Sequence, residues 1–265
     1  KECFEIMGKD RNSYSKTDLE ATFMRMKEDH MLNGQLKAAY NIQIAVENYF
    51  IVQAYVSNDR TDYNTLIPVL EKHKKAFGAV LREVTADSGY CSEKNLLYLK
   101  KQNISSYIKL QDHEKRKTRA YSEDISKYYN MRTGIFEDEQ FYICHDGREL
   151  RHLRTESKEQ DGYTQTFEVY GCADCSGCEH KARCLYKYDA EKDAEKNKVM
   201  KINEQWEELK ERSHANIQSE RGILKRQTRS IQTEGHFGDI KENENFRRFN
   251  YRSADKVYKE FMLYA

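Results

Sequence analysis

No stretch of this 265-residue chain is long and apolar enough for a transmembrane helix, and its N-terminus lacks the apolar core of a secretory signal. An internal repeat is also absent. These absences argue against integral membrane proteins, secreted proteins and repeat architectures. We therefore expect a cytoplasmic protein with no membrane partner.

A net charge of one sign is lacking as well, because 45 Lys and Arg residues stand against 44 Asp and Glu residues. The balance hides a local excess, since residues 221–252 hold eight basic and four acidic side chains. Aromatic residues make up 12% of the chain, which argues against wholesale disorder. We expect a folded protein with one basic surface, which suits a polyanionic partner.

The pattern of apolar residues predicts an α/β core. Residues 40–46 and 49–56 are two β-rich runs around Glu47-Asn48, which predicts a hairpin. A helix capped by Asp62, with Pro68 near its start, should follow. Next come a strand at 79–86, a helix at 92–101 capped by Ser92, and a strand at 105–110. This strand, helix and strand should pair in parallel through a right-handed connection.

The remaining chain is predicted to hold an insertion and a returning helix. Residues 111–215 should contain a hairpin around 141–144 and a charged, solvated helix at 189–212. A helix at 229–246 should return to the core through Ile231, Phe237 and Ile240. The expected organisation is an N-terminal segment, 1–35, a core formed by 36–110 and 216–265, and an insertion, 111–215.

Two acidic residues are candidates for catalysis. Asp87 ends an apolar run just before Gly89, a place where α/β proteins position catalytic groups. Its alternative role is a turn-forming Asp. Glu234 and Lys241 lie seven positions apart, about two helical turns on one face, a pairing that suggests phosphate chemistry. Their alternative roles are solvated surface charges.

A dense group of cysteines predicts a metal site. Cys172, Cys175, Cys178 and Cys184 form C-x2-C-x2-C-x5-C, and four thiolates can close a tetrahedral Zn²⁺ site. The successive two-residue spacings also suit iron–sulfur ligation, and free buried thiols are a third possibility. Cys144-His145 could replace one ligand. Cys3 and Cys91 have no metal-like spacing and are expected to be ordinary thiols.

Five stretches carry a resemblance to a known family: NSYSKTD at 12–18, ATFMRMK at 21–27, ADSGY at 86–90, FGDIK at 237–241 and FRRF at 246–249. They resemble bacterial insertion-sequence transposases of the DDE type, in the branch with a Tyr-Arg-Glu-Lys signature. The resemblance runs over almost the whole chain and is most specific at 15–43 and around Glu234. It implies a ribonuclease-H-like mixed sheet flanked by helices, with a cysteine-containing insertion before the last catalytic helix.

The resemblance also implies a reaction and its residues. Asp87 and Glu234 would be the second and third carboxylates of a three-acid site for Mg²⁺ or Mn²⁺. Lys241 would bind DNA next to the cleaved bond. Arg229, five residues before Glu234, would substitute for a signature arginine whose usual place holds Ser230. Arg247 and Arg248 are further candidates for binding DNA, with nearby aromatic rings for stacking.

One part of the family's pattern is missing from the chain. No residue matches the first catalytic aspartate, since Asp10 and Asp18 precede the hairpin without a strand signal, and the first strand of the sheet is also lacking. The chain is therefore expected to be a fragment or a decayed copy. The resemblance implies metal-dependent strand cleavage and strand transfer by a homodimer on DNA, in the bacterial cytoplasm at the nucleoid. The alternatives are a non-catalytic, zinc-stabilised DNA-binding remnant and a nuclease without strand transfer.

Overall fold

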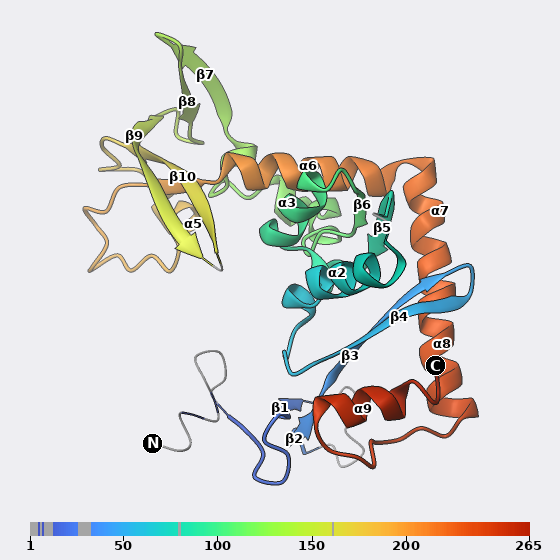
Figure 1. The fold of residues 1–265 in the computed structure, drawn as a ribbon. Coiled ribbons are helices and arrows are strands. Elements are labelled where there is room, and N and C mark those ends of the chain that lie inside the picture. Colours follow the sequence, from blue (N-terminus) through green and yellow to red (C-terminus); the bar gives the residue numbers. More distant parts are fainter. Residues whose placement is uncertain (1–4, 6, 8–12, 26–32, 79–80, 161) are drawn as a thin grey trace. The chain divides into compact units, whose positions relative to one another are not determined.

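The computed structural model describes residues 5, 7, 13–25, 33–78, 81–160 and 162–265 (Figure 1). The chain divides into two compact units. The discontinuous unit comprises residues 1–109 and 213–265, and the continuous unit comprises residues 110–212. The functional roles predicted for these segments stay predictions. Among the described residues, no helix combines the length and apolar character needed to span a membrane.

The predicted hairpin is confirmed in the discontinuous unit. β3 (Asn41–Glu47) pairs antiparallel with β4 (Phe50–Ser57). The turn lies at Asn48 and Tyr49, which both have positive φ, 49° and 66°, the backbone geometry whose twist matches that of two-stranded hairpins. A second antiparallel pair, β1 (Thr22–Arg25) with β2 (Leu36–Ala39), lies earlier in the chain.

The predicted strand–helix–strand unit is also confirmed. β5 (Glu83–Ala86) and β6 (Ser105–Ile108) pair in parallel, and α3 (Glu93–Lys101) connects them. Ser92 caps α3 as predicted, since its hydroxyl accepts a hydrogen bond from the backbone N–H of Asn95 at 3.2 Å. Both strands are shorter than predicted, and residues 79 and 80 lie outside the described residues.

The helix before β5 departs from the prediction at its start. A 3₁₀ turn, η1 (Asp62–Asn64), precedes α2 (Leu66–Phe77). The predicted cap by Asp62 is wrong, because its carboxylate instead accepts hydrogen bonds from the side-chain amides of Asn41 and Gln43 on β3. Pro68 lies in the first turn of α2, where its missing N–H costs no helical hydrogen bond.

The strands of the discontinuous unit do not join into one hydrogen-bonded sheet. Within the described ranges, β3–β4 and β5–β6 are separate two-stranded sheets. The architecture is mixed α/β as predicted, whereas the ribonuclease-H-like mixed sheet remains an expectation.

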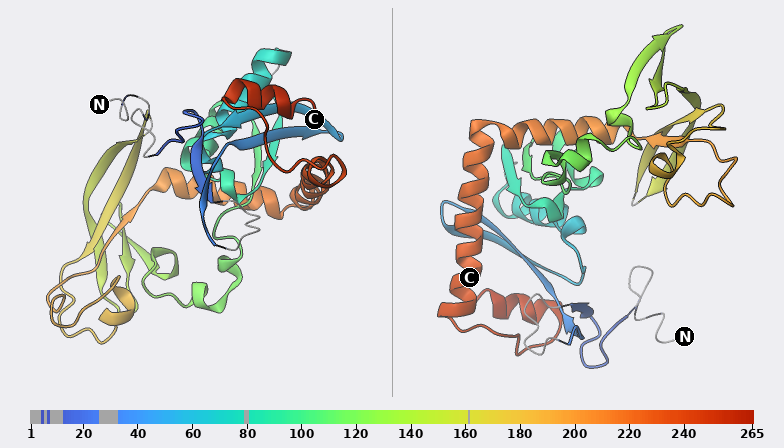
Figure 2. Two further views of the ribbon diagram at one scale, coloured as in Figure 1. Left: turned by 90° about the horizontal axis from the view of Figure 1, so that it is seen from below. Right: turned by 180° about the vertical axis from the view of Figure 1, so that it is seen from behind.

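A helical path leads from residue 204 to residue 243. Its segments are α6 (Glu204–Gln218), α7 (Glu220–Arg229), the π-helical turn η5 (Ser230–Glu234), α8 (Gly235–Gly238) and the π-helical turn η6 (Asp239–Asn243). α9 (Ala254–Phe261) follows after a loop. Figure 2 shows α7 and α8 running beside the β3–β4 hairpin, in agreement with the contacts between β3 and η5.

The core of the discontinuous unit forms where this path meets the hairpin. Ile240, Ala54 and Phe261 are buried together, and Phe246 and Phe249 pack against them. The prediction for Ile240 is confirmed, but the one for Ile231 is wrong, because its side chain is 63% exposed. Phe237 is half-buried. The π turns break the 3.6-residue periodicity on which these predictions relied.

The continuous unit is built on a five-stranded antiparallel sheet in the order β11-β10-β9-β8-β7. The strands are β7 (Arg132–Phe136), β8 (Glu139–Ile143), β9 (Glu149–Gln160), β10 (Tyr163–Cys172) and β11 (Val199–Ile202). The short helices are η3 (Lys115–Lys117), α4 (Arg119–Ser122), η4 (Tyr128–Asn130) and α5 (Lys181–Cys184). The sheet's buried core includes Tyr142, Leu150, Tyr170 and Ile202.

Two predictions in this unit have different outcomes. The hairpin around 141–144 is confirmed as β7 with β8. The helix predicted at 189–212 is wrong in its first half, because β11 occupies Val199–Ile202 and α6 begins only at Glu204. The apolar residues of β11 complete the sheet beside β10. The Asn203 side chain then accepts a hydrogen bond from the Trp206 N–H at 2.9 Å at the start of the helix.

Candidate active site

Asp87 directly follows β5 and starts a tight turn. Its extended backbone, with φ −80° and ψ −178°, precedes the 3₁₀ turn η2 (Ser88–Tyr90). One carboxylate oxygen, Oδ1, accepts a hydrogen bond from the Gly89 N–H at 2.8 Å. Asp87 therefore stabilises a turn, as its alternative role predicts. A single bond of this kind still leaves a carboxylate with further acceptor sites.

A second carboxylate, Asp62, lies against the same turn. A Cβ built on Gly89 would stand 2.9 Å from Asp62 Oδ2 and 3.0 Å from Asp87 Oδ1. Asp62 Oδ1 is held by the amides of Asn41, at 2.8 Å, and Gln43, at 2.9 Å. Sequence reasoning missed this residue as a site candidate. The available signal was the spacing of Asn41 and Gln43, which places two amide donors on one face of a strand.

Tyr90 extends this polar cluster. Its hydroxyl donates to the side-chain oxygen of Gln43. Burial raises the pKa of Tyr90, the negative charges of Asp62 and Asp87 raise it further, and Arg229 acts in the opposite direction. The hydroxyl is therefore a proton donor at neutral pH. Because all three charged groups act on one hydroxyl, Arg229 lies within electrostatic reach of the site that holds both aspartates.

The position of Arg229 follows from the docking of α7 on β5. Glu83, at the start of β5, pairs with Lys225 and also with Arg221 at 2.7 Å. The hydrogen bond from Lys225 is the main cause that lowers the pKa of the Glu83 carboxyl. Residues 221, 225 and 229 repeat every four positions, so they lie on one face of the helix. The first two pair with Glu83 at the beginning of β5, and Arg229 follows one turn later at the end of α7.

Glu234 lies one segment further, in the π turn η5. Its side chain is 68% exposed and accepts a hydrogen bond from Arg229 Nη2 at 3.4 Å. The adjacent α8 is tied to the hairpin, because His236 Nε2 lies 3.0 Å from the backbone oxygen of Tyr49. Single π turns within helices are frequent at functional sites. The structure thus pairs Glu234 with Arg229, and the charge of Arg229 also lowers the pKa of Tyr90.

The side chains around Asp87 and Glu234 can be compared with the requirements of a metal site. No three His, Cys, Asp or Glu side chains of the described residues converge closely enough to hold a metal ion in this conformation. The available donors are carboxylate oxygens, which suit Mg²⁺ or Mn²⁺. Arg229 is the present counter-charge of Glu234, so the ion pair has to open before this carboxylate joins Asp87 at a metal.

The predicted DNA-binding residues follow Glu234 along the chain. Lys241 lies in η6 and is half-buried. The expectation that Lys241 shares a helix face with Glu234 assumed α-helical geometry. Of the segments between these two residues, only α8 is an α-helix. Both Arg247 and Arg248 are exposed, but Arg247 pairs with both carboxylate oxygens of Glu242 at 3.0 and 3.2 Å, and Arg248 forms no such pair with the described residues. The two arginines therefore differ in their availability to phosphate.

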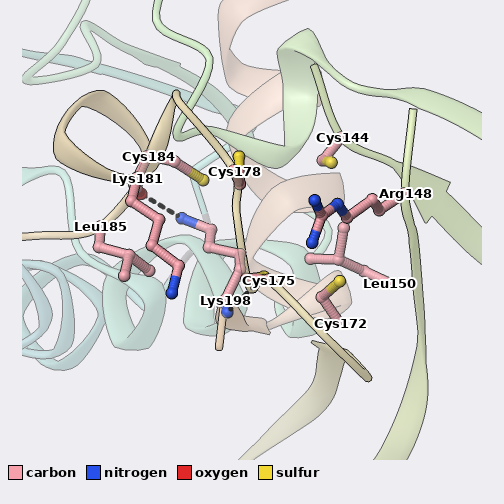
Figure 3. A pocket seen from close by; sticks show the side chains of 10 residues that line it. All are labelled: Cys144, Arg148, Leu150, Cys172, Cys175, Cys178, Lys181, Cys184, Leu185 and Lys198. Carbon is pink, nitrogen blue, oxygen red and sulfur yellow. Dashed lines mark hydrogen bonds between the residues drawn. The ribbon is translucent and has the colours of Figure 1, made fainter. Parts of the chain in front are cut away.

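The four predicted cysteine ligands lie together in the continuous unit. Cys172, Cys175, Cys178 and Cys184 line one pocket, and Cys144, directly after β8, lines it too (Figure 3). All five are free thiols. Burial raises the pKa of Cys172 to about 11 and also raises the pKa of Cys178 and Cys184. Without a metal, these three thiols are protonated at neutral pH.

Of the other residues named from the sequence, Cys91 and Asp18 lie in the described part of the chain. Cys91 is buried. Asp18 is a structural anchor, because its carboxylate accepts hydrogen bonds from the Tyr40 hydroxyl at 2.9 Å and the Ser253 N–H at 3.1 Å. Cys3 and Asp10 lie outside the described residues.

Comparison with known proteins finds a similarity in the C-terminal part of the chain. No curated protein and no solved structure matches. Residues 143–265 match the family model described as "Transposase DDE domain". The matched region starts at the end of β8 and contains the cysteine pocket, Arg229, Glu234 and the basic residues, whereas Asp87 precedes it. This match supports a transposase of the DDE class, whose domains generally use divalent metal ions.

Proposed function

We propose that this chain is the catalytic part of a bacterial insertion-sequence transposase of the Tyr-Arg-Glu-Lys signature branch, with a ribonuclease-H-like core. The reaction would be metal-dependent cleavage of a DNA strand followed by attack of the freed 3′-hydroxyl on target DNA. One observation carries the proposal: the carboxylates of Asp62 and Asp87 approach one position beside Gly89, at 2.9 and 3.0 Å. The family match over residues 143–265 supports the same reading.

The carboxylates would form the acidic centre of the site. Asp87 and Glu234 would hold Mg²⁺ or Mn²⁺, and Asp62 adds a third carboxylate next to Asp87. When bound, the metal ions supply activation of the attacking oxygen and stabilisation of the leaving oxygen. The amides of Asn41 and Gln43 orient Asp62, and the Tyr90 hydroxyl stays protonated as a donor beside it.

The basic residues would bind the substrate. Arg229 would exchange its partner Glu234 for a phosphate near the cleaved bond, which also releases Glu234 toward the metal. Lys241, Arg247 and Arg248 would contact the DNA backbone outside this centre. Paired transposon ends require two catalytic centres, so we expect a homodimer on DNA, at the nucleoid of the bacterial cytoplasm.

A second candidate function has its own support. The Arg229–Glu234 ion pair and the lack of three convergent carboxylates among the described residues favour a non-catalytic DNA-binding remnant, whose stabilisation by zinc would require the cysteines to move together. Such a protein would occupy element ends without cutting them. A metal-dependent nuclease without strand transfer is the third reading, and it would produce nicks without joined products.

Nicking and joining of supercoiled DNA in Mn²⁺ distinguishes these readings. We expect nicked and joined products from the parent chain, and loss of both in Asp87→Asn and Glu234→Gln. Glu244→Gln is the matched control, because Glu244 is an exposed acid close to η6, and it should keep full activity. Arg229→Met should lower the rate by at least about tenfold, with partial recovery in Arg229→Lys.

The other outcomes are equally informative. Nicks without joined products would support the nuclease. DNA binding without nicks in the parent would support the remnant. Activity that survives in Asp87→Asn would remove this residue from the site.

A further inference from the structure

Five thiols from separate parts of the continuous unit meet at one pocket, which is one more than a tetrahedral metal site uses. Cys144 follows β8, Cys172 ends β10, Cys175 and Cys178 lie in the next turn, and Cys184 ends α5. Figure 3 shows their sulfur atoms distributed around the pocket. We propose that Cys144, Cys175, Cys178 and Cys184 form a structural zinc site and that Cys172 lies outside it.

Cys172 differs from the others in what its backbone and sulfur do. It is the last residue of β10 and pairs with Leu150 in the sheet, so the ladder fixes its backbone. Its Sγ donates a hydrogen bond to the backbone oxygen of Asp174 at 3.2 Å. Cys172 is therefore a packing residue of the sheet core that includes Tyr142 and Tyr170.

Cys175 and Cys178 have the geometry of a metal-binding turn. The Cys178 N–H donates to the backbone oxygen of Cys175 at 3.4 Å, which closes the turn between them. The sulfur of Cys175 accepts a hydrogen bond from the Lys198 N–H at 3.4 Å, an interaction that stabilises a thiolate. The Cys175 N–H is also fixed by the Asn197 side chain at 2.8 Å.

Cys144 and Cys184 complete the set from the other sides of the pocket. Cys144 lies in a tight turn, in which its N–H donates to the Arg148 oxygen at 2.9 Å and its oxygen accepts from the Gly147 N–H at 3.0 Å. Cys184 lies within electrostatic reach of Cys144, Cys175 and Cys178. All four ligands therefore lie in turns or at the end of a short helix, where side chains can adjust.

The charge around the pocket suits bound thiolates. A zinc ion with four thiolates carries a net charge of −2, and Arg148, Lys181 and Lys198 also line the pocket. Arg148 and Lys198 hold the surrounding backbone as well, because Arg148 donates to Asp174 and Ser176 oxygens and Lys198 donates to the Cys184 oxygen. These cations compensate the charge that four thiolates would bring.

Metal binding has to draw the thiols together. Sulfur atoms bound to one zinc lie roughly 4 Å apart, and the described conformation holds no such group of ligands. Rotation about χ1 between staggered rotamers changes where a cysteine sulfur points, so the proposed site requires such rotations at its ligands. The bound ion would connect the turn after β8 to residues 173–198, which contain little regular structure.

The test is metal content, Co²⁺ spectra and thiol protection of the purified chain. We expect one zinc per chain, and a Co²⁺-substituted protein with the absorption of a tetrahedral four-thiolate site. Cys144→Ser, Cys175→Ser, Cys178→Ser and Cys184→Ser should each weaken zinc binding by at least about tenfold. Cys172→Ser and Cys91→Ser are matched buried-cysteine controls and should keep one zinc and the same Co²⁺ spectrum.

Alkylation of the chain without substitutions tests the proposal even if the cysteine variants fail to fold. Zinc should protect Cys144 and Cys184 from iodoacetamide, and EDTA should expose them. Loss of metal in Cys172→Ser with retention in Cys144→Ser would overturn the assignment. A parent chain without metal, or with iron and sulfide in place of zinc, would overturn it as well. None of these readouts depends on DNA cleavage, so the site stands or fails independently of the proposed function.

Discussion

The carboxylates of Asp62 and Asp87 approach the same position, the one that a Cβ atom on residue 89 would occupy if it were not glycine. Their Oδ2 and Oδ1 atoms lie 2.9 and 3.0 Å from that point. Gly89 keeps this position empty without needing a positive φ, so its role is close approach and not an unusual backbone conformation. Two acids from different elements can therefore act on one small volume next to β5.

Replacement of Gly89 by Ala should disturb the acidic site more than the fold. The added methyl group displaces Asp62, which the Asn41 and Gln43 amides hold in place, and Asp87. We expect roughly tenfold weaker Mn²⁺ binding by calorimetry and a loss of about 1 kcal/mol in unfolding free energy. Gly238→Ala is the control, because its methyl group would meet nothing within 4 Å. Equal Mn²⁺ affinity in both variants would contradict this role of Gly89.

The Glu83 ion pairs should make the docking of α7 depend on pH. The Glu83 pKa is lowered in the folded state from an ordinary value of 4.5, so its stabilisation is present above that pH and disappears as pH falls through the lowered pKa. Urea unfolding at pH 7 should show Glu83→Gln to be less stable by about 0.2–1 kcal/mol, and the difference should vanish near pH 2. Asp255→Asn is the control, since the Lys259–Asp255 pair is over 70% exposed at both side chains. A difference that persists at pH 2 would mean that Glu83 acts through packing.

Arg248 should contribute more to DNA binding than Arg247. Arg247 is already bonded to both oxygens of Glu242 and has to give up that pair to reach a phosphate, whereas Arg248, exposed like Arg247, forms no such pair with the described residues. In a plot of log affinity against log salt concentration, Arg248→Gln should reduce the slope by about 0.9, and Arg247→Gln by less. Glu242→Gln should release Arg247 and strengthen binding. The reverse order of the two arginines would show that DNA approaches from another side.

Glu260 should be one of the most sensitive acids for stability. Its side chain is 4% exposed on α9. Its carboxylate accepts hydrogen bonds from the Asn250 N–H at 2.9 Å, the Asn250 side chain at 2.9 Å and the Tyr251 N–H at 3.0 Å. Glu260→Ala leaves these donors without an acceptor, and we expect a loss of about 1–3 kcal/mol in urea unfolding. Glu244→Gln, an exposed change, should leave the midpoint unaltered, and an equal loss in the two variants would refute the prediction.

Local patterns were enough to predict several elements. The hairpin β3–β4, the Ser92 cap of α3 and the parallel pairing of β5 with β6 depend on alternation, a capping side chain and the strand–helix–strand order. Asp87 could be proposed because it follows the strand in sequence. The four clustered cysteines could be proposed because their spacing is short.

Long-range contacts decided what the patterns could not. Asp62 was expected to cap a helix, but amide donors from β3, about twenty residues away, hold it beside Asp87. Cys144 reaches the cysteine pocket only because β8 lies two strands from β10 in the sheet. Ile231 lies in the π turn η5 and is exposed, although an α-helical pattern predicted it in the core. Residues Val199–Ile202 were predicted as helix but form a strand that pairs with β10.

The amino-acid sequence by itself thus determined the elements with strong local signals and the acids and thiols that could carry chemistry. Only the tertiary structure decided which of these groups meet. The reason is physical: local periodicity and capping act over a few residues, whereas the grouping of Asp62 with Asp87 depends on hydrogen bonds between segments that are distant along the chain.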